Sequence, residues 1–258
     1  MDSINHKIIN VNGINMHVAE VGQGPVVPFH PPWLPRIMVH LAPPTSLHGG
    51  TRLQGSDLVA LIDVVAPDER KVFVVGHDWG AMIAWALCLC RPDKVKALVN
   101  MSVVFSLRNP KNKPTEALHA VYGDEYYISR FQKPGEIEAV FAQTGTRTVF
   151  ENRVAFLDYY ASKYEKSGFT GALNYYRALD LNWELTAPWT GAQIKVPVKF
   201  IVGDLDLTYN APGIKDYIHK GGLKKYVPLL KDVVVMEGVA HFLHEVNQHI
   251  IDFIRKGH

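Results

Sequence analysis

The sequence has little cysteine, little net charge and no long apolar run. Its two cysteines, Cys88 and Cys90, lie two positions apart on an expected helix and point in different directions, which excludes a disulfide framework and a paired metal site. Lys and Arg number 27 against 25 Asp and Glu, so no basic face for nucleic acid or a membrane surface is expected. No stretch approaches the roughly 20 apolar residues of a membrane span, and the first residues do not resemble a secretory signal. These absences favour a cytoplasmic protein.

The apolar segments that are present follow the rhythm of an α/β protein. Residues 6–20 alternate around Asn12-Gly13, which predicts an antiparallel hairpin. A helix is expected at 57–65. Further strands are expected at 71–76, 95–101, 196–202 and 232–236, mostly with helices between them. This order predicts a mostly parallel sheet with helices on both faces and a ligand site at the carboxyl ends of its strands.

The middle of the chain shows a different pattern. Between about Arg108 and Trp189 the sequence predicts helices without strands. We therefore expect a helical lid at 108–189, inserted between two parts of the core domain, 1–107 and 190–258.

The most informative motif is Gly76-His77-Asp78-Trp79-Gly80, which joins a β-branched apolar run to an apolar helix. A G-x-nucleophile-x-G turn thrusts its central side chain above the sheet, next to the start of the following helix. Here that side chain is a carboxylate, which suits attack at carbon and formation of an alkyl ester. The alternative is an aspartate that only caps the helix.

An acid and a histidine follow the last two expected strands. Asp204 and Asp206 come after 198–202, and His241 follows 233–236. Nucleophile, acid and histidine in this order match the α/β-hydrolase triad, in which His241 activates water and the acid orients it. Asp206 is the preferred acid, although spacing leaves Asp204 as an alternative.

Beyond the triad, the chain resembles the plant-type soluble epoxide hydrolases of the α/β-hydrolase fold. The motifs are GHDWGA and RPDKVKALVN within 71–102, YISRFQKPGE at 127–136, NYYRAL and NWELTAPWTGAQ within 171–193, and the stretch 197–244. The resemblance implies hydrolysis of a lipophilic epoxide to a vicinal diol with water, without metal or organic cofactor. The sequence has no heptad repeat or long apolar edge, so monomer and homodimer are both left open. The resemblance also implies that Tyr127 and Tyr176 donate hydrogen bonds to the epoxide oxygen, with Tyr126 and Tyr175 as packing or rim residues.

One segment departs from the family pattern. The resemblance places H-G-x-P after the third strand, where a backbone N–H joins that of Trp79 in an oxyanion hole, but this chain has His30-Pro31-Pro32-Trp33. Proline has no N–H to donate, so one donor is expected to be missing unless Trp33 or another group replaces it. A one-base shift in a coding sequence for 32–39 gives His-Gly-Phe-Pro-Glu-Leu-Trp, so we hypothesise that this segment is frame-shifted.

Other pieces of the family pattern are not recognisable. A fourth strand is not apparent before the helix at 57–65, and the chain is expected to be shortened near 152–153 and 245–247. Two alternatives to an epoxide hydrolase remain. One is a haloalkane or haloacetate dehalogenase, which shares the aspartate elbow. The other is an inactive or truncated ligand-binding relative, which the altered proline-rich segment at 28–44 supports.

Overall fold

The computed structural model describes residues 5–20, 28–29, 37–40, 51–150, 157–243 and 246–256. The chain divides into two compact units. The core unit comprises the described residues up to 40, Thr51–Arg108 and Pro188 onwards. The helical unit comprises the described residues of Asn109–Ala187.

The first sheet of the core unit opens with the predicted hairpin. Its strands occur in the order β1 (Asn5–Val11), β2 (Ile14–Glu20), β4 (Ile37–His40) and β3 (Pro28–Phe29). β1 pairs with β2 in antiparallel register around Asn12 and Gly13, whose φ angles of 51° and 79° suit a tight turn between twisted strands. The hairpin prediction is therefore confirmed.

The prediction that a fourth strand is missing was wrong. β4 runs antiparallel to β2, with Val18 opposite Val39, and parallel to β3, with Phe29 opposite Met38. The residues Ile37, Met38 and Val39 are apolar and mostly have branched side chains, which favour a pleated strand. A short strand therefore occupies the place between β2 and β3.

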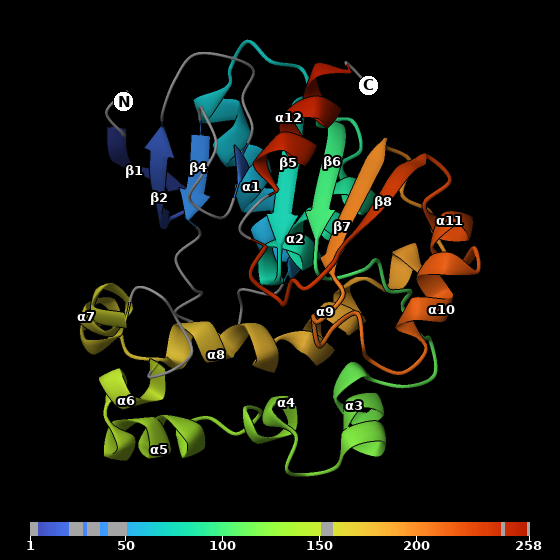
Figure 1. Ribbon diagram of the computed structural model, residues 1–258. Coiled ribbons are helices and arrows are strands. Elements are labelled where there is room, and N and C mark those ends of the chain that lie inside the picture. Colours follow the sequence, from blue (N-terminus) through green and yellow to red (C-terminus); the bar gives the residue numbers. More distant parts are fainter. Residues whose placement is uncertain are drawn as a thin grey trace. The chain divides into compact units, whose positions relative to one another are not determined.

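The second sheet is parallel throughout and follows sequence order. Its strands are β5 (Val72–His77), β6 (Val95–Met101), β7 (Val198–Gly203) and β8 (Leu230–Met236) (Figure 1). β5 also lies beside β3 of the first sheet. All four expected strands are present. Because they are parallel, their carboxyl ends meet at one edge, where the acid, the histidine and the elbow follow them.

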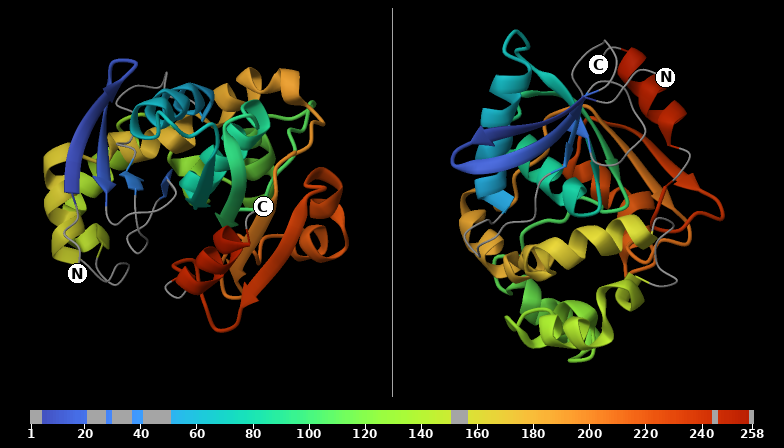
Figure 2. Two further views of the ribbon diagram at one scale, coloured as in Figure 1. Left: turned by 90° about the horizontal axis from the view of Figure 1, so that it is seen from above. Right: turned by 90° about the vertical axis from the view of Figure 1, so that its left-hand side faces the viewer.

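Helices cover both faces of this parallel sheet (Figure 2). α1 (Thr51–Val65) and α2 (Trp79–Cys90) pack together on one face, and α1 begins six residues before the expected start. On the other face, α12 (Asn247–Arg255) packs its apolar side chains against alternate residues of the strands, including Phe73 and Val75. The described part of the core unit also contains the short helices α10 (Ile214–His219) and α11 (Gly222–Tyr226), while η1 (Ala187–Trp189) begins with the last residue of the helical unit and continues into the core unit.

The described residues of the helical unit form helices and connecting turns, without strands. The helices are α3 (Pro114–Tyr122), α4 (Tyr127–Arg130), α5 (Glu136–Thr144), α6 (Thr146–Phe150), α7 (Leu157–Ser167), α8 (Thr170–Arg177) and α9 (Leu179–Leu185). The expected shortening near 152–153 lies outside the described residues. Residue 245, at the start of the second segment that is expected to be shortened, also lies outside them.

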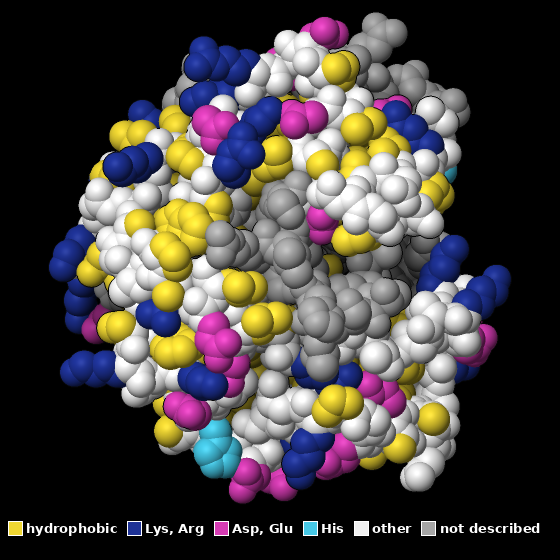
Figure 3. Space-filling view, turned by 180° about the vertical axis from the view of Figure 1, so that it is seen from behind, with side chains coloured by type: hydrophobic (Ala, Val, Ile, Leu, Met, Phe, Trp, Pro, Cys, Tyr) yellow, Lys and Arg dark blue, Asp and Glu magenta, His cyan; other side chains and the backbone are white. Residues whose placement is uncertain are grey.

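From the sequence we expect no disulfide framework, no basic face for nucleic acid or a membrane surface, and no membrane span. Cys88 is buried and Cys90 half-buried, and both are free thiols. Basic and acidic side chains are interspersed on the face shown in Figure 3. Among the helices that the structure describes, none is long and apolar enough to cross a bilayer.

Candidate active site

Asp78 stands on a strained turn between β5 and α2. Its φ of 54° and ψ of −123° are rare for a residue with a side chain, and its carboxylate makes no capping hydrogen bond to α2. The turn is tight: a Cβ on Gly76 would lie 2.5 Å from Oδ1 of Asn100 and 2.9 Å from Cα of Ala81. Glycine is therefore required at 76, and the geometry opposes the interpretation of Asp78 as an ordinary cap.

His241 lies between two carboxylates. Its Nε2 is 3.4 Å from Oδ1 of Asp78, and its Nδ1 is 3.2 Å from Oδ2 of Asp206. Asp78 follows β5, Asp206 follows β7 and His241 follows β8. The structure thus brings together three residues that are far apart in the sequence, as expected at the carboxyl edge of a parallel sheet.

Asp206 and Asp204 have different tasks. Asp206 is fully buried, and its Oδ1 accepts hydrogen bonds from the backbone N–H and the hydroxyl of Thr208, each 2.9 Å away. Asp204 instead accepts the backbone N–H of Val239 at 3.2 Å and so ties down the loop that carries His241. The geometry therefore assigns Asp206, not Asp204, as the partner of His241.

Gly203 allows this loop to approach the end of β7. A Cβ at position 203 would lie 2.1 Å from the backbone oxygen of Val239 and 2.7 Å from that of Ala240. No side chain fits at such distances, so only glycine lets the loop pack here. Gly203 thus sets the position of His241 without touching it.

The charges of the site stabilise one another. Burial alone would lower the pKa of His241, but its hydrogen bonds to Asp206 and Asp78 and their negative charges raise it to about 9. Partial burial alone would raise the pKa of Asp78, but the hydrogen bond and charge of His241 and the backbone N–H of Trp79 lower it. At neutral pH the site therefore holds an imidazolium between two carboxylates.

Asp206 is the more strongly stabilised of the two anions. Burial opposes its ionisation, but hydrogen bonds from His241, the N–H of Thr208 and Ser102 outweigh burial and lower the pKa of Asp206 to about 2. A carboxylate that stays ionised can fix the orientation of His241 across the whole range in which His241 titrates.

Sequence reasoning gave no task to His77. Its Nε2 lies 2.9 Å from the backbone oxygen of His241, and the two imidazole rings are 4.8 Å apart. Burial and the nearby charge of His241 lower the pKa of His77. The only sequence signal was its position next to Asp78 in the elbow.

Tyr127 and Tyr176 form an aromatic contact within the helical unit. Their ring centroids are 5.8 Å apart with an interplanar angle of 82°, an edge-to-face geometry, and Phe131 contacts both rings. Tyr127 opens α4, and Tyr176 is the next-to-last residue of α8. Tyr126 stacks on Tyr122 at 4.4 Å.

Comparison with known proteins identifies the family. The family model described as "alpha/beta hydrolase fold" matches residues 66–248. Epoxide hydrolase 3 of Siraitia grosvenorii is 45% identical, with 99% of this chain and 100% of the relative covered. The structure of potato (Solanum tuberosum) epoxide hydrolase I superimposes with a TM-score of 0.90 at 48% identity, with 98% and 100% covered. The chain belongs to the plant-type epoxide hydrolases. An epoxide hydrolase of Vigna radiata is also similar, with a TM-score of 0.89, 44% identity and 98% of each chain covered.

This epoxide hydrolase lacks residues at some positions of its relatives. The alignment with the Siraitia grosvenorii protein extends over 317 residues, whereas the chain has 258, although both are covered almost completely. The difference must therefore consist of internal gaps. This finding agrees with the expectation that pieces of the family pattern are missing.

Of the three residues expected at the oxyanion hole of this epoxide hydrolase, the structure describes Trp79. The backbone N–H of Trp79 lies at the start of α2, beside the carboxylate of Asp78. His30 and Trp33 lie outside the described residues.

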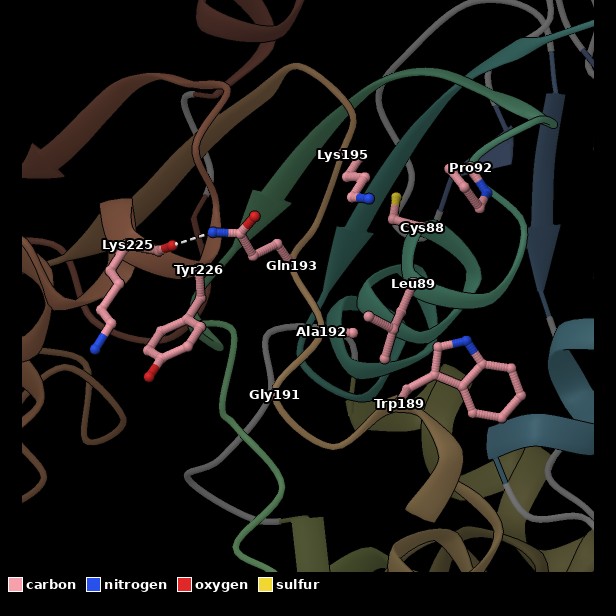
Figure 4. Close-up of a pocket in the computed structure, with 10 residues that line it drawn as sticks. All are labelled: Cys88, Leu89, Pro92, Trp189, Gly191, Ala192, Gln193, Lys195, Lys225 and Tyr226. Carbon is pink, nitrogen blue, oxygen red and sulfur yellow. Dashed lines mark hydrogen bonds between the residues drawn. The ribbon is translucent and has the colours of Figure 1, made fainter.

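A cavity of this epoxide hydrolase lies at the carboxyl-terminal end of α2, away from Asp78 (Figure 4). The cavity has a volume of about 620 Å³ and is lined by residues that include Cys88, Trp189 and Lys195. On one side of it, Nε2 of Gln193 donates a hydrogen bond to the backbone oxygen of Lys225. None of the triad residues lines this cavity, so it is not the catalytic site.

Proposed function

We propose that this epoxide hydrolase converts a lipophilic epoxide to a vicinal diol through an ester on Asp78. The observation that carries the proposal is the placement of His241, with Nε2 facing Asp78 and Nδ1 facing the buried Asp206. A carboxylate in the nucleophile position calls for two steps, because an alkyl ester forms first and must then be hydrolysed.

In the first step, a carboxylate oxygen of Asp78 attacks an epoxide carbon. The carbon–oxygen bond of the ring breaks, and its electron pair stays on the epoxide oxygen. Phenols are neutral hydrogen-bond donors near pH 7, so Tyr127 and Tyr176 can stabilise the developing alkoxide with their hydrogen bonds. The low pKa of Asp78 keeps this nucleophile ionised.

Ester formation prepares the second step by removing the negative charge of Asp78. Because that charge and its hydrogen bond help to raise the pKa of His241, their loss lowers the pKa, and the imidazolium can release its proton toward the alkoxide. Neutral His241 then takes a proton from water. The resulting hydroxide attacks the ester carbonyl carbon, and the bond from that carbon to the alkyl oxygen breaks. The alkyl oxygen takes the proton of the new carboxyl group, so the diol leaves and Asp78 is again a carboxylate.

The tyrosine pair also distinguishes this reaction from dehalogenation. A departing halide needs no proton, whereas the alkoxide from an epoxide does. Tyr127 and Tyr176 lie with their rings in contact, which supports a shared hydrogen-bonded oxygen. Each relative reported above is named an epoxide hydrolase, which favours the same substrate class.

Intact-protein mass spectrometry after mixing with a styrene-oxide-type epoxide tests the proposal, with Asp78→Asn as the control. Diol formation that depends on Asp78, with or without a transient adduct, supports both steps. A stable adduct that depends on Asp78 means that alkylation works and ester hydrolysis is slow, as expected if an oxyanion donor is missing. Neither adduct nor diol from a folded chain would contradict the proposal and favour a ligand-binding relative.

A further inference from the structure

Arg177 and Glu138 form a largely buried ion pair within the helical unit. Nη1 of Arg177 is 2.7 Å from Oε1 of Glu138, and Nη2 is 2.8 Å from Oε2, which is the two-pronged geometry of a guanidinium and a carboxylate. The side chain of Arg177 is 2% exposed and that of Glu138 is 18% exposed. The pair joins the last residue of α8 to the first turn of α5.

The same guanidinium also binds the segment that follows α4. Its Nε donates to the backbone oxygen of Phe131 at 2.9 Å, and its Nη2 donates to that of Lys133 at 3.2 Å. Glu138 in turn accepts the backbone N–H of Gly135 at 3.0 Å. Arg177 and Glu138 therefore fix the chain between α4 and α5 as well as the end of α8.

Both tyrosines of the proposed mechanism are attached to these fixed segments. Tyr176 directly precedes Arg177, and the backbone oxygen of Tyr127 accepts the N–H of Phe131 at 3.0 Å. Gln132 adds a bridge, since its Nε2 donates to the backbone oxygen of Tyr176 at 3.2 Å and to that of Ile128 at 2.9 Å. The ring of Phe131 lies 5.1 Å from that of Tyr176 and 5.6 Å from that of Tyr127.

We propose that the Arg177–Glu138 pair positions Tyr127 and Tyr176 for epoxide opening, an inference that rests on the proposed function. The pair does not supply a reacting group. It holds the backbone at Phe131 and Lys133 against α8, and this spacing sets how closely the two phenols approach one oxygen. Misplacement of a hydrogen-bond donor by about 1 Å can cost about a hundredfold in rate.

The geometry requires arginine and not simply a positive charge. Arg177 uses three nitrogens to reach two carbonyl oxygens and both carboxylate oxygens at once. Lysine has one nitrogen on a flexible chain and cannot span these acceptors. Arg177→Lys should therefore fail to restore the placement of the tyrosines, although it keeps the charge opposite Glu138.

Single-turnover kinetics with a styrene-oxide-type epoxide separate the two half-reactions. We expect Arg177→Lys to slow formation of the Asp78 ester by about ten- to a hundredfold, while hydrolysis of the ester formed changes by less than about threefold. Arg147→Lys is the matched control, because Arg147 pairs with Asp158 on the exposed surface of the same unit. Arg147→Lys should change neither the rate of ester formation nor the rate of ester hydrolysis. Equal slowing of both half-reactions, or wild-type rates for Arg177→Lys, would overturn the inference.

A double variant separates an effect on the placement of the tyrosines from a failure to fold. Arg177→Met combined with Glu138→Met removes both charges together, so no buried charge is left unpaired. We expect this double variant to fold, to form the ester slowly and to hydrolyse it normally. Rapid ester formation by the folded double variant would contradict the proposal.

If the proposed function is wrong, the wild type itself forms neither ester nor diol, and this result differs from slow ester formation in the variant alone. The positioning of the rings is then measured by NMR as nuclear Overhauser contacts between labelled Tyr127 and Tyr176. Their ring centroids are 5.8 Å apart in the structure. We expect these contacts to be lost in Arg177→Lys and kept in Arg147→Lys. Contacts that persist in Arg177→Lys would overturn the inference whatever the activity.

Discussion

His77 donates a hydrogen bond from Nε2 to the backbone oxygen of His241, 2.9 Å away. A carbonyl oxygen only accepts, so His77 carries its proton on Nε2. Burial and the charge of His241 lower the pKa of His77, which keeps the ring uncharged near pH 7. The residue before the nucleophile thus holds the backbone of the base that later acts on the ester.

Substitution of His77 should slow hydrolysis of the ester. His77→Phe leaves the backbone oxygen of His241 without its hydrogen-bond donor, so we expect the rate of ester hydrolysis to fall by about ten- to a hundredfold. His77→Gln offers an amide N–H in a similar place and should retain more of the rate. The measurement is decay of the Asp78 adduct by mass spectrometry. A faster decay in His77→Phe than in His77→Gln would contradict the interpretation.

The pKa of His241 should depend on the charge of Asp78. We expect His241 to titrate at about 9 in the wild type, because both carboxylates stabilise the imidazolium. Asp78→Asn removes one of them and should lower this pKa, whereas Asp204→Asn should leave it nearly unchanged, since Asp204 binds the N–H of Val239. NMR titration of the imidazole C–H signals measures the values. An unchanged pKa in Asp78→Asn would disprove the coupling on which the second step depends.

Stability should fall in alkaline solution. The pKa of His241 is raised from 6.5 in the unfolded chain to about 9 in the folded protein. Its contribution to the free energy of unfolding is therefore fully present below 6.5 and is lost as the pH rises through about 9. Urea unfolding on both sides of this window, in the wild type and in His241→Asn, isolates the effect. The loss should be larger in the wild type, and equal losses would show that other groups cause it.

Gly203→Ala should displace the loop that carries His241. The new Cβ would meet the backbone oxygen of Val239 at 2.1 Å, so we expect a loss of about 1–3 kcal/mol in the free energy of unfolding and severe loss of ester hydrolysis. Gly238→Ala is the control in the same loop, since its φ is +70° but no atom lies within 4 Å of an added Cβ. It should cost about 1 kcal/mol through backbone strain alone. Thermal unfolding and adduct decay are the measurements.

Local patterns predicted the elements that depend on neighbouring residues. Asn12-Gly13 can adopt positive φ angles, so the hairpin was predictable from two residues. The apolar runs predicted β5, β6, β7 and β8, and the glycine at 76 predicted the tight turn at Asp78. β4 was missed, because a four-residue strand gives a weak periodic signal and depends on pairing with β2 and β3.

The sequence by itself determined the order of the elements, the carboxylate in the elbow and the resemblance to the plant-type epoxide hydrolases, since turn residues, apolar periodicity and short motifs are local properties of the chain. Only the tertiary structure decided that Asp206 and not Asp204 faces His241, that His77 holds the backbone of His241, and that Arg177 binds Glu138. These relationships join residues that lie far apart along the chain, or depend on which way a side chain points. Packing of the strands and loops fixes both, and spacing along the sequence does not.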